Sequence, residues 1–328
     1  MKRIIRVSAP GQIFLFGEHA VVYGQPALAA AINISTEAKA KPRADDQIKI
    51  VSKGVGNLKG KVKKTNGDWS IQEKTGELSR LRFVVKTAEI TLNHLDEGSG
   101  FELEIDSEVP VGSGLGSSSA VTTATAAAIS SIFDRNLSKD DISDLAYDAE
   151  LKVQGAASKT GVKVATHGGF LKVTGDEMNS ISDISELKVL IGNTGDYGNT
   201  GELVKKVRLS KESRPEIINP IIEAIGKTTE AGIKSLQDEN LEKVGVLMNV
   251  NQNLLEGLGV SSPKLRKLIK AARDAGGKGA KITGAGGGGC MVALTEESVD
   301  RISRAIEKKG GEPIKVKVGV EGLSFDSK

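Results

Sequence analysis

The sequence predicts an α+β protein, and three observations support this fold class. Short segments in the first half alternate apolar and polar residues, as at 101–105, which is typical of half-buried strands. The second half is mostly helical in pattern, and its end at 279–319 reads strand, loop, strand, helix, strand, as a split βαβ unit would. The 328 residues fit one large or two medium domains with a substantial buried core.

The individual elements follow from local patterns. In the first half we expect strands at 4–7 and 12–16, a helix or strand at 26–40, a hairpin at 47–75, a helix at 81–93 and a strand at 101–105. An Ala-rich helix is expected at 117–133 and a second helix from an N-cap at Ser138 to Val153. We then expect strands at 162–173 and 187–191, helices at 200–209, 214–235, 239–256 and 263–275, strands at 279–283 and 290–294, a helix at 296–309 and a strand at 313–319.

Composition excludes several classes of protein. The formal net charge of +3 is too balanced to indicate a nucleic-acid or membrane partner, and aromatic residues are too few for base stacking. No segment has the length and apolar character of a membrane span or signal peptide. A single cysteine, Cys290, cannot form an internal disulfide, so we expect a cytoplasmic protein. The three His residues and the cysteine give no zinc pattern, whereas a cation held by oxygens stays open.

A glycine-rich loop before a helix is the most informative local feature. Residues 110–120 read PVGSGLGSSSA, with glycines at 112, 114 and 116 and hydroxyl residues opening the predicted helix. Glycines let backbone N–H groups approach an anion, and a helix N-terminus adds unpaired donors and a positive dipole end. The loop therefore predicts a phosphate site, although such a loop alone is equally compatible with an ordinary turn. It is neither a Walker P-loop nor a convincing dinucleotide fingerprint.

Three motifs in a fixed order resemble the GHMP kinase superfamily. They are APG…FGEHAVVYG at 9–24, PVGSGLGSSSA at 110–120 and KITGAGGGGC at 281–290. The first and third are similar to those of archaeal-type mevalonate kinases, and segments 150–158 and 247–252 add to this similarity. The resemblance implies a two-domain α+β fold, with a ribosomal-S5-like domain at 1–172, a ferredoxin-like domain at 173–328, and ATP and the acceptor bound in the cleft between them.

The resemblance also implies roles for particular residues. ATP would be bound by Gly112, Ser113, Gly114, Leu115, Gly116, Ser117, Ser118, Gly284, Ala285 and Gly286. Ser118 and Glu150 would hold Mg²⁺, and Glu18 and His19 would contact the acceptor, mevalonate or a related hydroxy acid. Family members are often homodimers, which is the oligomeric state expected here. The alternative interpretations are a packed turn histidine, a solvated helical glutamate and a plain flexible glycine loop.

Two positions depart from the family pattern. Gln12 stands where mevalonate kinases have Lys, and Gly161 stands where the family places an Asp, the expected base for the acceptor hydroxyl. Because the Lys and the Asp are both replaced, no single charge is left without its partner. If this segment is extended, Lys159, Gly161 and Lys163 share a face and create a new anion site; the alternative is exposed lysines beside a disabled or redesigned site. The catalytic candidates are Gln12, Gly161, Lys159 and Thr160.

Three functions remain open on this basis. The first is ATP- and Mg²⁺-dependent phosphorylation of mevalonate to 5-phosphomevalonate, slow without the base but still supported by positioning and charge neutralisation. The second is a non-catalytic ATP or metabolite binder. The third is a diverged or engineered enzyme with another acceptor or reaction, which uses Lys159 or Lys163.

Overall fold

The computed structural model describes residues 4–155, 157–175 and 177–325, and its α+β architecture confirms the predicted fold class. Ala156 of the 150–158 motif and the outer ends of the two predicted domains lie outside the described residues. The first half contains β1 (Ile5–Phe16), the 3₁₀ helix η1 (Ala20–Tyr23), β2 (Ala27–Pro42), β3 (Gln47–Ser52), β4 (Gly56–Thr65), β5 (Asp68–Gly76), α1 (Arg82–Leu95), β6 (Phe101–Ser107), α2 (Ser117–Ile132) and α3 (Lys139–Gln154). The second half contains α4 (Lys159–His167), β7 (Phe170–Thr174), β8 (Glu177–Ile181), β9 (Leu187–Asn193), α5 (Thr200–Ser213), α6 (Pro215–Gln237), α7 (Leu241–Gly257), α8 (Pro263–Asp274), β10 (Gly279–Ile282), β11 (Cys290–Leu294), α9 (Val299–Glu307), β12 (Glu312–Val318) and β13 (Ser324–Phe325).

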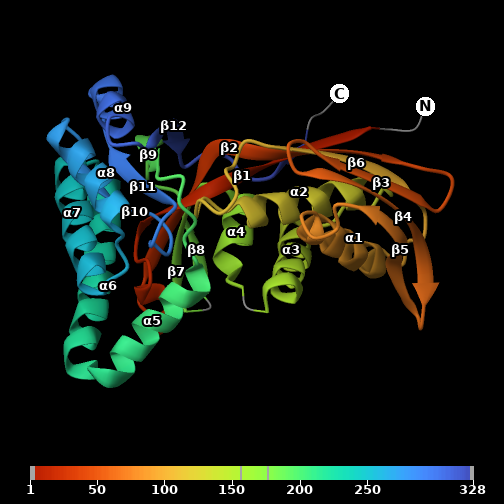
Figure 1. The fold of residues 1–328 in the computed structure, drawn as a ribbon, viewed down its shortest axis with the longest axis horizontal. Helices are drawn as coiled ribbons and strands as arrows, with labels where there is room; N and C mark the ends of the chain where they lie inside the picture. Colours follow the sequence, from red (N-terminus) through yellow and green to blue (C-terminus); the bar gives the residue numbers. More distant parts are fainter. Residues whose placement is uncertain (1–3, 156, 176, 326–328) are drawn as a thin grey trace.

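One mixed sheet runs through the molecule and is centred on β2. Its main path is β10-β11-β9-β12-β2-β6-β3-β4-β5, and β1 and β7 also pair with β2. Neighbouring strands are antiparallel except β3 and β6, which are parallel. The C-terminal part joins the rest where Val318 of β12 pairs with Ile32 of β2. Figure 1 shows β1 and β2 crossing the middle of the molecule between two groups of helices.

The helices cover the two parts of the sheet separately. Helices α1, α2 and α4 lie against the N-terminal strands, and α3 packs on these three helices. Helices α7–α9 lie beside β9–β12, and α6 packs against α7 (Figure 1). Helix α2 is buried along most of its length, and its small Ala, Ser and Thr side chains let the surrounding helices and strands approach it closely. No helix within the described ranges has the length and apolar character needed to cross a membrane.

Two local differences from the sequence-based expectations affect the site. Residues 5–16 form one continuous strand with an irregular register between Pro10 and Gly11, where two separate strands were expected. The strand predicted at 162–173 is wrong in its first half, because residues 159–167 form α4. Ser158 caps this helix by accepting a hydrogen bond from the backbone N–H of Thr160, so the segment carrying Gly161 is helical. The predicted cap at Ser138 is confirmed, and Asp141 completes a capping box there.

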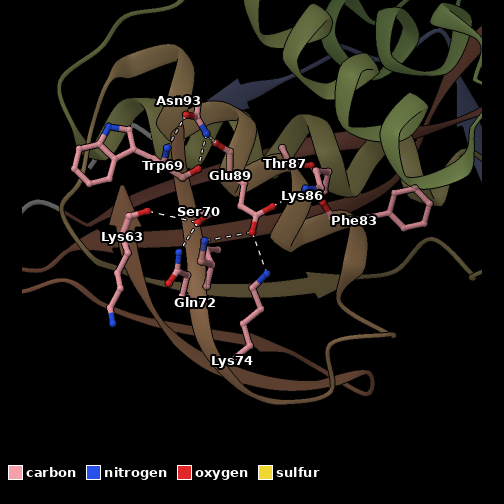
Figure 2. A network of polar contacts seen from close by, with 11 residues as sticks. Lys63, Trp69, Ser70, Gln72, Lys74, Phe83, Lys86, Thr87, Glu89 and Asn93 are labelled. Carbon is pink, nitrogen blue, oxygen red and sulfur yellow. Dashed lines mark hydrogen bonds and ion pairs between the residues drawn. The ribbon is translucent and has the colours of Figure 1, made fainter. Parts of the chain in front are cut away.

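A buried carboxylate fixes β5 to α1. Glu89 of α1 accepts hydrogen bonds from the backbone N–H of Ile71 and from Lys74 and Lys86, at 3.2, 3.0 and 2.7 Å. Figure 2 shows this network beside the bonds between Asn93 and the Trp69 backbone. The network therefore sets the position of α1 relative to the hairpin strands, and the first turn of α1 belongs to the wall of the candidate site.

Candidate functional site

The loop before α2 has the conformation that its glycines allow. Gly112, Gly114 and Gly116 have φ angles of 72°, 81° and 75°, in the left-handed region that other residues rarely adopt. Gly116 directly precedes the sixteen-residue helix α2, with no side-chain cap on the first N–H groups. These donors and the positive end of the helix dipole are free to bind an anion, as the sequence predicts.

A second glycine-rich segment packs against this loop through backbone contacts. A Cβ added at Gly289 would lie 2.6 Å from the carbonyl oxygen of Ser113, and one at Gly284 would lie 3.4 Å from that of Gly114. The segment is also tied to β1, because the backbone N–H of Phe14 donates to Thr283 Oγ1 at 2.8 Å. The three glycine motifs of the sequence therefore meet in space.

A cavity of about 700 Å³ opens where these motifs meet. One wall is the glycine loop and the start of α2, a second is the 283–289 segment with residues 197–200, and a third is formed by residues 52–55 and 79–84. The Tyr197 ring covers Gly112, since a Cβ at that glycine would lie 2.4 Å from the ring. The volume of the cavity is within the range of pockets that enclose a small-molecule ligand.

The carboxylate of Glu150 lies behind the first turn of α2. Its side chain is only 4% exposed and accepts a hydrogen bond from Ser119 Oγ at 3.0 Å. Burial raises the pKa of Glu150 above its ordinary value, and hydrogen bonds from Ser118 and Ser119 act in the opposite direction. A buried carboxylate beside two hydroxyl groups and a phosphate loop fits Mg²⁺, which uses oxygen ligands and few protein carboxylates. The solvated-face interpretation of Glu150 is therefore wrong.

The two departures from the family pattern lie next to each other. A Cβ built on Gly161 would lie 3.2 Å from Gln12 Nε2, and one built on Gly116 would lie 2.7 Å from Gln12 Cγ. The backbone N–H of Gln12 also donates to Leu115 at 2.9 Å. Gln12 is thus placed between the phosphate loop and the face of α4 that carries Gly161.

The expected anion site at Lys159, Gly161 and Lys163 is not formed. In a helix, residues four apart share a face and residues two apart lie on nearly opposite sides, so both lysines point away from Gly161. Lys163 Nζ lies 2.6 Å from Asp140 Oδ1, and Lys159 Nζ lies 5.3 Å from the centre of the Tyr147 ring. The expectation assumed an extended backbone, whereas the Ser158 cap starts a helix. Thr160, the remaining catalytic candidate, is buried in the first turn of α4.

Glu18 and His19 hold the second glycine-rich segment. The buried carboxylate of Glu18 pairs with the fully buried ammonium of Lys281, and His19 Nε2 lies 2.8 Å from the carbonyl oxygen of Ala285. This places a proton on Nε2, and burial lowers the pKa of His19, so its ring is neutral near pH 7. Within the described residues, the hydrogen bonds of these two side chains do not reach Gln12 or Gly161. Their contact with the acceptor stays a prediction.

Sequence reasoning missed two residues of this site. Lys281 opens the third motif and was given no role, although a lysine within an otherwise apolar strand indicates a buried partner. Ser119 is a second such residue, because its hydroxyl contacts both Glu150 and the Gly161 position. No local pattern distinguishes Ser119 from its neighbours, because the contact depends on the packing of three helices.

The fold and the site together define a nucleotide-dependent phosphotransferase class, and the sequence matches agree. Residues 82–169 match the family described as GHMP kinases N terminal domain, and residues 233–312 match GHMP kinases C terminal. The chain belongs to the GHMP kinase family, whose members use ATP as the phosphoryl donor. The kinase prediction made from the three motifs is therefore confirmed.

The chain is similar over its full length to several mevalonate kinases. The mevalonate kinase of Pyrococcus abyssi is 40% identical over 332 residues, which cover 99% of each chain. The crystal structure of the Methanococcus jannaschii mevalonate kinase has a TM-score of 0.80 at 28% identity, covering 96% of this chain and 98% of that one. The L. major mevalonate kinase in complex with R-mevalonate has a TM-score of 0.83, covers 96% of each chain and, at 23% identity, shares the fold.

Proposed function

We propose that this protein transfers the γ-phosphoryl group of ATP to mevalonate and forms 5-phosphomevalonate. The observation that carries the proposal is a cavity of about 700 Å³ lined by the glycine loop at 112–118 and the 283–289 segment. The first glycine motif packs against both of these segments, and the buried Glu150 lies behind the first turn of α2. The full-length similarity to mevalonate kinases, at 40% identity to the Pyrococcus abyssi enzyme, supports mevalonate as the acceptor.

The proposed roles follow from position. The backbone N–H groups of residues 112–118 bind the phosphates of ATP, and residues 284–286 close over them from the opposite wall. Ser118 and Glu150 would hold Mg²⁺, which neutralises phosphate charge when bound. Glu18 and His19 would contact the acceptor, while their bonds to Lys281 and Ala285 hold the second glycine-rich segment in place.

The transfer step needs no charged base at position 161. The acceptor oxygen forms a bond to the γ-phosphorus while the bond from phosphorus to the bridging oxygen breaks, and ADP leaves. The hydroxyl proton passes to an oxygen of the transferred group and from there to water. Because the transition state is loose, the hydroxyl does not have to lose its proton early. Without a general base, turnover is expected to be about 10²–10⁴-fold below that of a site that has one.

Three further assignments belong to the proposal. We place the domain boundary at 172/173, expect a homodimer and expect a cytoplasmic location. The match to the N-terminal family domain, which ends at residue 169, supports the boundary. The homodimer rests on the family resemblance alone, and the single cysteine, Cys290, supports the location.

Phosphorus NMR of a reaction with ATP, Mg²⁺ and R-mevalonate tests the function directly. We expect ADP and a phosphate monoester of the primary hydroxyl to appear in equal amounts, and no ADP without mevalonate. Glu150→Gln should abolish turnover, whereas Asp148→Asn, an exposed position on the same helix, should not. Nucleotide binding without product would indicate a non-catalytic binder, and turnover only with another hydroxy acid would indicate a different acceptor.

A further inference from the structure

Ser119 occupies the space where a side chain at position 161 would begin. A Cβ built on Gly161 would lie 2.2 Å from Ser119 Oγ and 3.1 Å from Ser119 Cβ. The first distance is far shorter than any real contact, so the Ser119 hydroxyl in this position and a side chain at 161 exclude each other. Ser119 lies in the first turn of α2 and is 5% exposed, and turning its hydroxyl away from position 161 would break its hydrogen bond to Glu150.

The orientation of the Ser119 hydroxyl is fixed by Glu150. Ser119 Oγ donates its one hydrogen to Glu150 Oε1 at 3.0 Å, so its lone pairs are left to accept a hydrogen bond. Gln12 also faces the Gly161 position, because its Nε2 lies 3.2 Å from a Cβ built there, and its Oε1 is buried with no hydrogen-bond partner within the described residues. An unpartnered buried oxygen is costly, and a ligand that donates a hydrogen would satisfy it.

We propose that Gln12 and Ser119 form a neutral hydrogen-bonding site for the hydroxyl group of the acceptor, in place of a charged pair at positions 12 and 161. This inference rests on the proposed kinase function. Ser119 Oγ or Gln12 Oε1 accepts the single hydrogen of the attacking hydroxyl, and the two side chains together orient its oxygen towards the phosphate loop. Neither side chain takes the proton, because a neutral hydroxyl and an amide are not bases at neutral pH.

Thermal stability tests whether Ser119 occupies the space beside Gly161. The effect of Gly161→Ala on Tm should have opposite signs with and without the Ser119 hydroxyl. Gly161 lies inside a helix with an ordinary backbone conformation, so helix propensity alone predicts that Gly161→Ala raises Tm. The contact with Ser119 predicts the opposite, a fall of Tm by at least about 2–4 °C. In the Ser119→Ala background the clash is gone, and Gly161→Ala should then raise Tm. A rise in both backgrounds would overturn the packing argument.

Steady-state kinetics test whether Gln12 and Ser119 bind the acceptor hydroxyl. Ser119→Ala and Gly161→Ala each remove the same correctly placed hydroxyl, so each should lower kcat/KM for mevalonate by about tenfold. The double variant should lose no more than either single variant, because the shared interaction is already gone. Gln12→Met, which keeps the side-chain length without hydrogen bonding, should lower the same constant. The dissociation constant of Mg²⁺·ATP should change less than twofold in all four variants.

The other outcomes are decisive as well. The proposal would be contradicted if the losses of kcat/KM in the two single variants multiplied in the double variant. It would also be contradicted if the affinity for Mg²⁺·ATP fell as much as kcat/KM, because Ser119 would then act on the nucleotide. If the wild-type protein does not phosphorylate mevalonate, the proposed function fails, and calorimetric binding of R-mevalonate in the presence of ADP and Mg²⁺ replaces kinetics. Binding that is unchanged by Ser119→Ala and Gln12→Met would then overturn the neutral site.

Discussion

Lys281 and Glu18 form an ion pair in the interior of the protein, between motifs 263 residues apart in the sequence. Lys281 Nζ also donates to the carbonyl oxygen of Ile282, at 2.5 Å. The pair connects the residues after β1 to the strand that leads into the second glycine-rich segment. It therefore fixes one side of the site to the other.

Removing one partner of this pair should destabilise the protein strongly. Lys281→Met leaves the Glu18 carboxylate buried and unpaired, which should lower the free energy of unfolding by about 3–5 kcal/mol in urea denaturation. Lys281→Met/Glu18→Gln should lose much less, because no isolated charge remains. As a matched control, Lys315→Met breaks an exposed pair with Asp300 and should cost less than about 1 kcal/mol. Equal losses at 281 and 315 would contradict this role.

Acidification should weaken the fold through His19. Its pKa is below 6.5 in the folded protein because of burial, so the unfolded chain binds more protons as the pH falls. The contribution of His19 is present above pH 6.5 and is lost as the pH falls through the folded pKa, by at most about 1.4 kcal/mol per pH unit. Unfolding free energies between pH 8 and 5 should show this slope in the wild-type protein and a smaller slope in His19→Asn. If the free energy of unfolding had the same pH dependence in both proteins, His19 would not be responsible for the loss of stability.

The glycine loop should tolerate no side chain at position 112. Gly112→Ala adds a Cβ that meets the Tyr197 ring at 2.4 Å, at a φ of 72°. Gly310→Ala is a matched control, because Gly310 has a φ of 76° and open space around it. Both variants should lose about 1–2 kcal/mol of stability to backbone strain. Only Gly112→Ala should also weaken ATP binding, as measured by calorimetry; an equal loss of affinity in both would exclude a local role.

Rebuilding the charged pair should require a third substitution. In Gln12→Lys/Gly161→Asp the new aspartate Cβ would meet Ser119 Oγ at 2.2 Å, so this double variant should be less stable and poorly active. Adding Ser119→Ala makes room, and turnover of mevalonate should then rise by up to about 10²–10⁴-fold above that of the wild-type protein. Full activity in the double variant would show that Ser119 is no obstacle.

The sequence predicts most of this architecture because its local signals are strong. The capping box at Ser138 and the Ala-rich run of α2 each determine a helix from a few neighbouring residues. The strand expected around Gly161 is not formed: β-branched residues such as Val162 and Val164 favour a strand, whereas the decisive Ser158 cap is a single hydrogen bond. The reliable part of the prediction is therefore the part encoded within a few residues.

The candidate site also has a part that local sequence predicts and a part that depends on long-range contacts. Its three glycine motifs can be identified in the sequence, and they pack together in the structure as the family resemblance implies. The partner of Glu18 and the position of Ser119 depend on contacts between elements far apart in the chain, which no local pattern records. Lysines 159 and 163 were given the wrong direction for a related reason, since one change from extended to helical backbone reverses their face.

Calorimetric titration of the protein with ATP in the presence of Mg²⁺ shows whether residues 112–118 bind the triphosphate. We expect saturable binding at one site per chain, weakened in both Gly112→Ala and Glu150→Gln. Absence of binding at millimolar nucleotide, in a protein shown to be folded, would contradict the assignment of residues 112–118 as the triphosphate site.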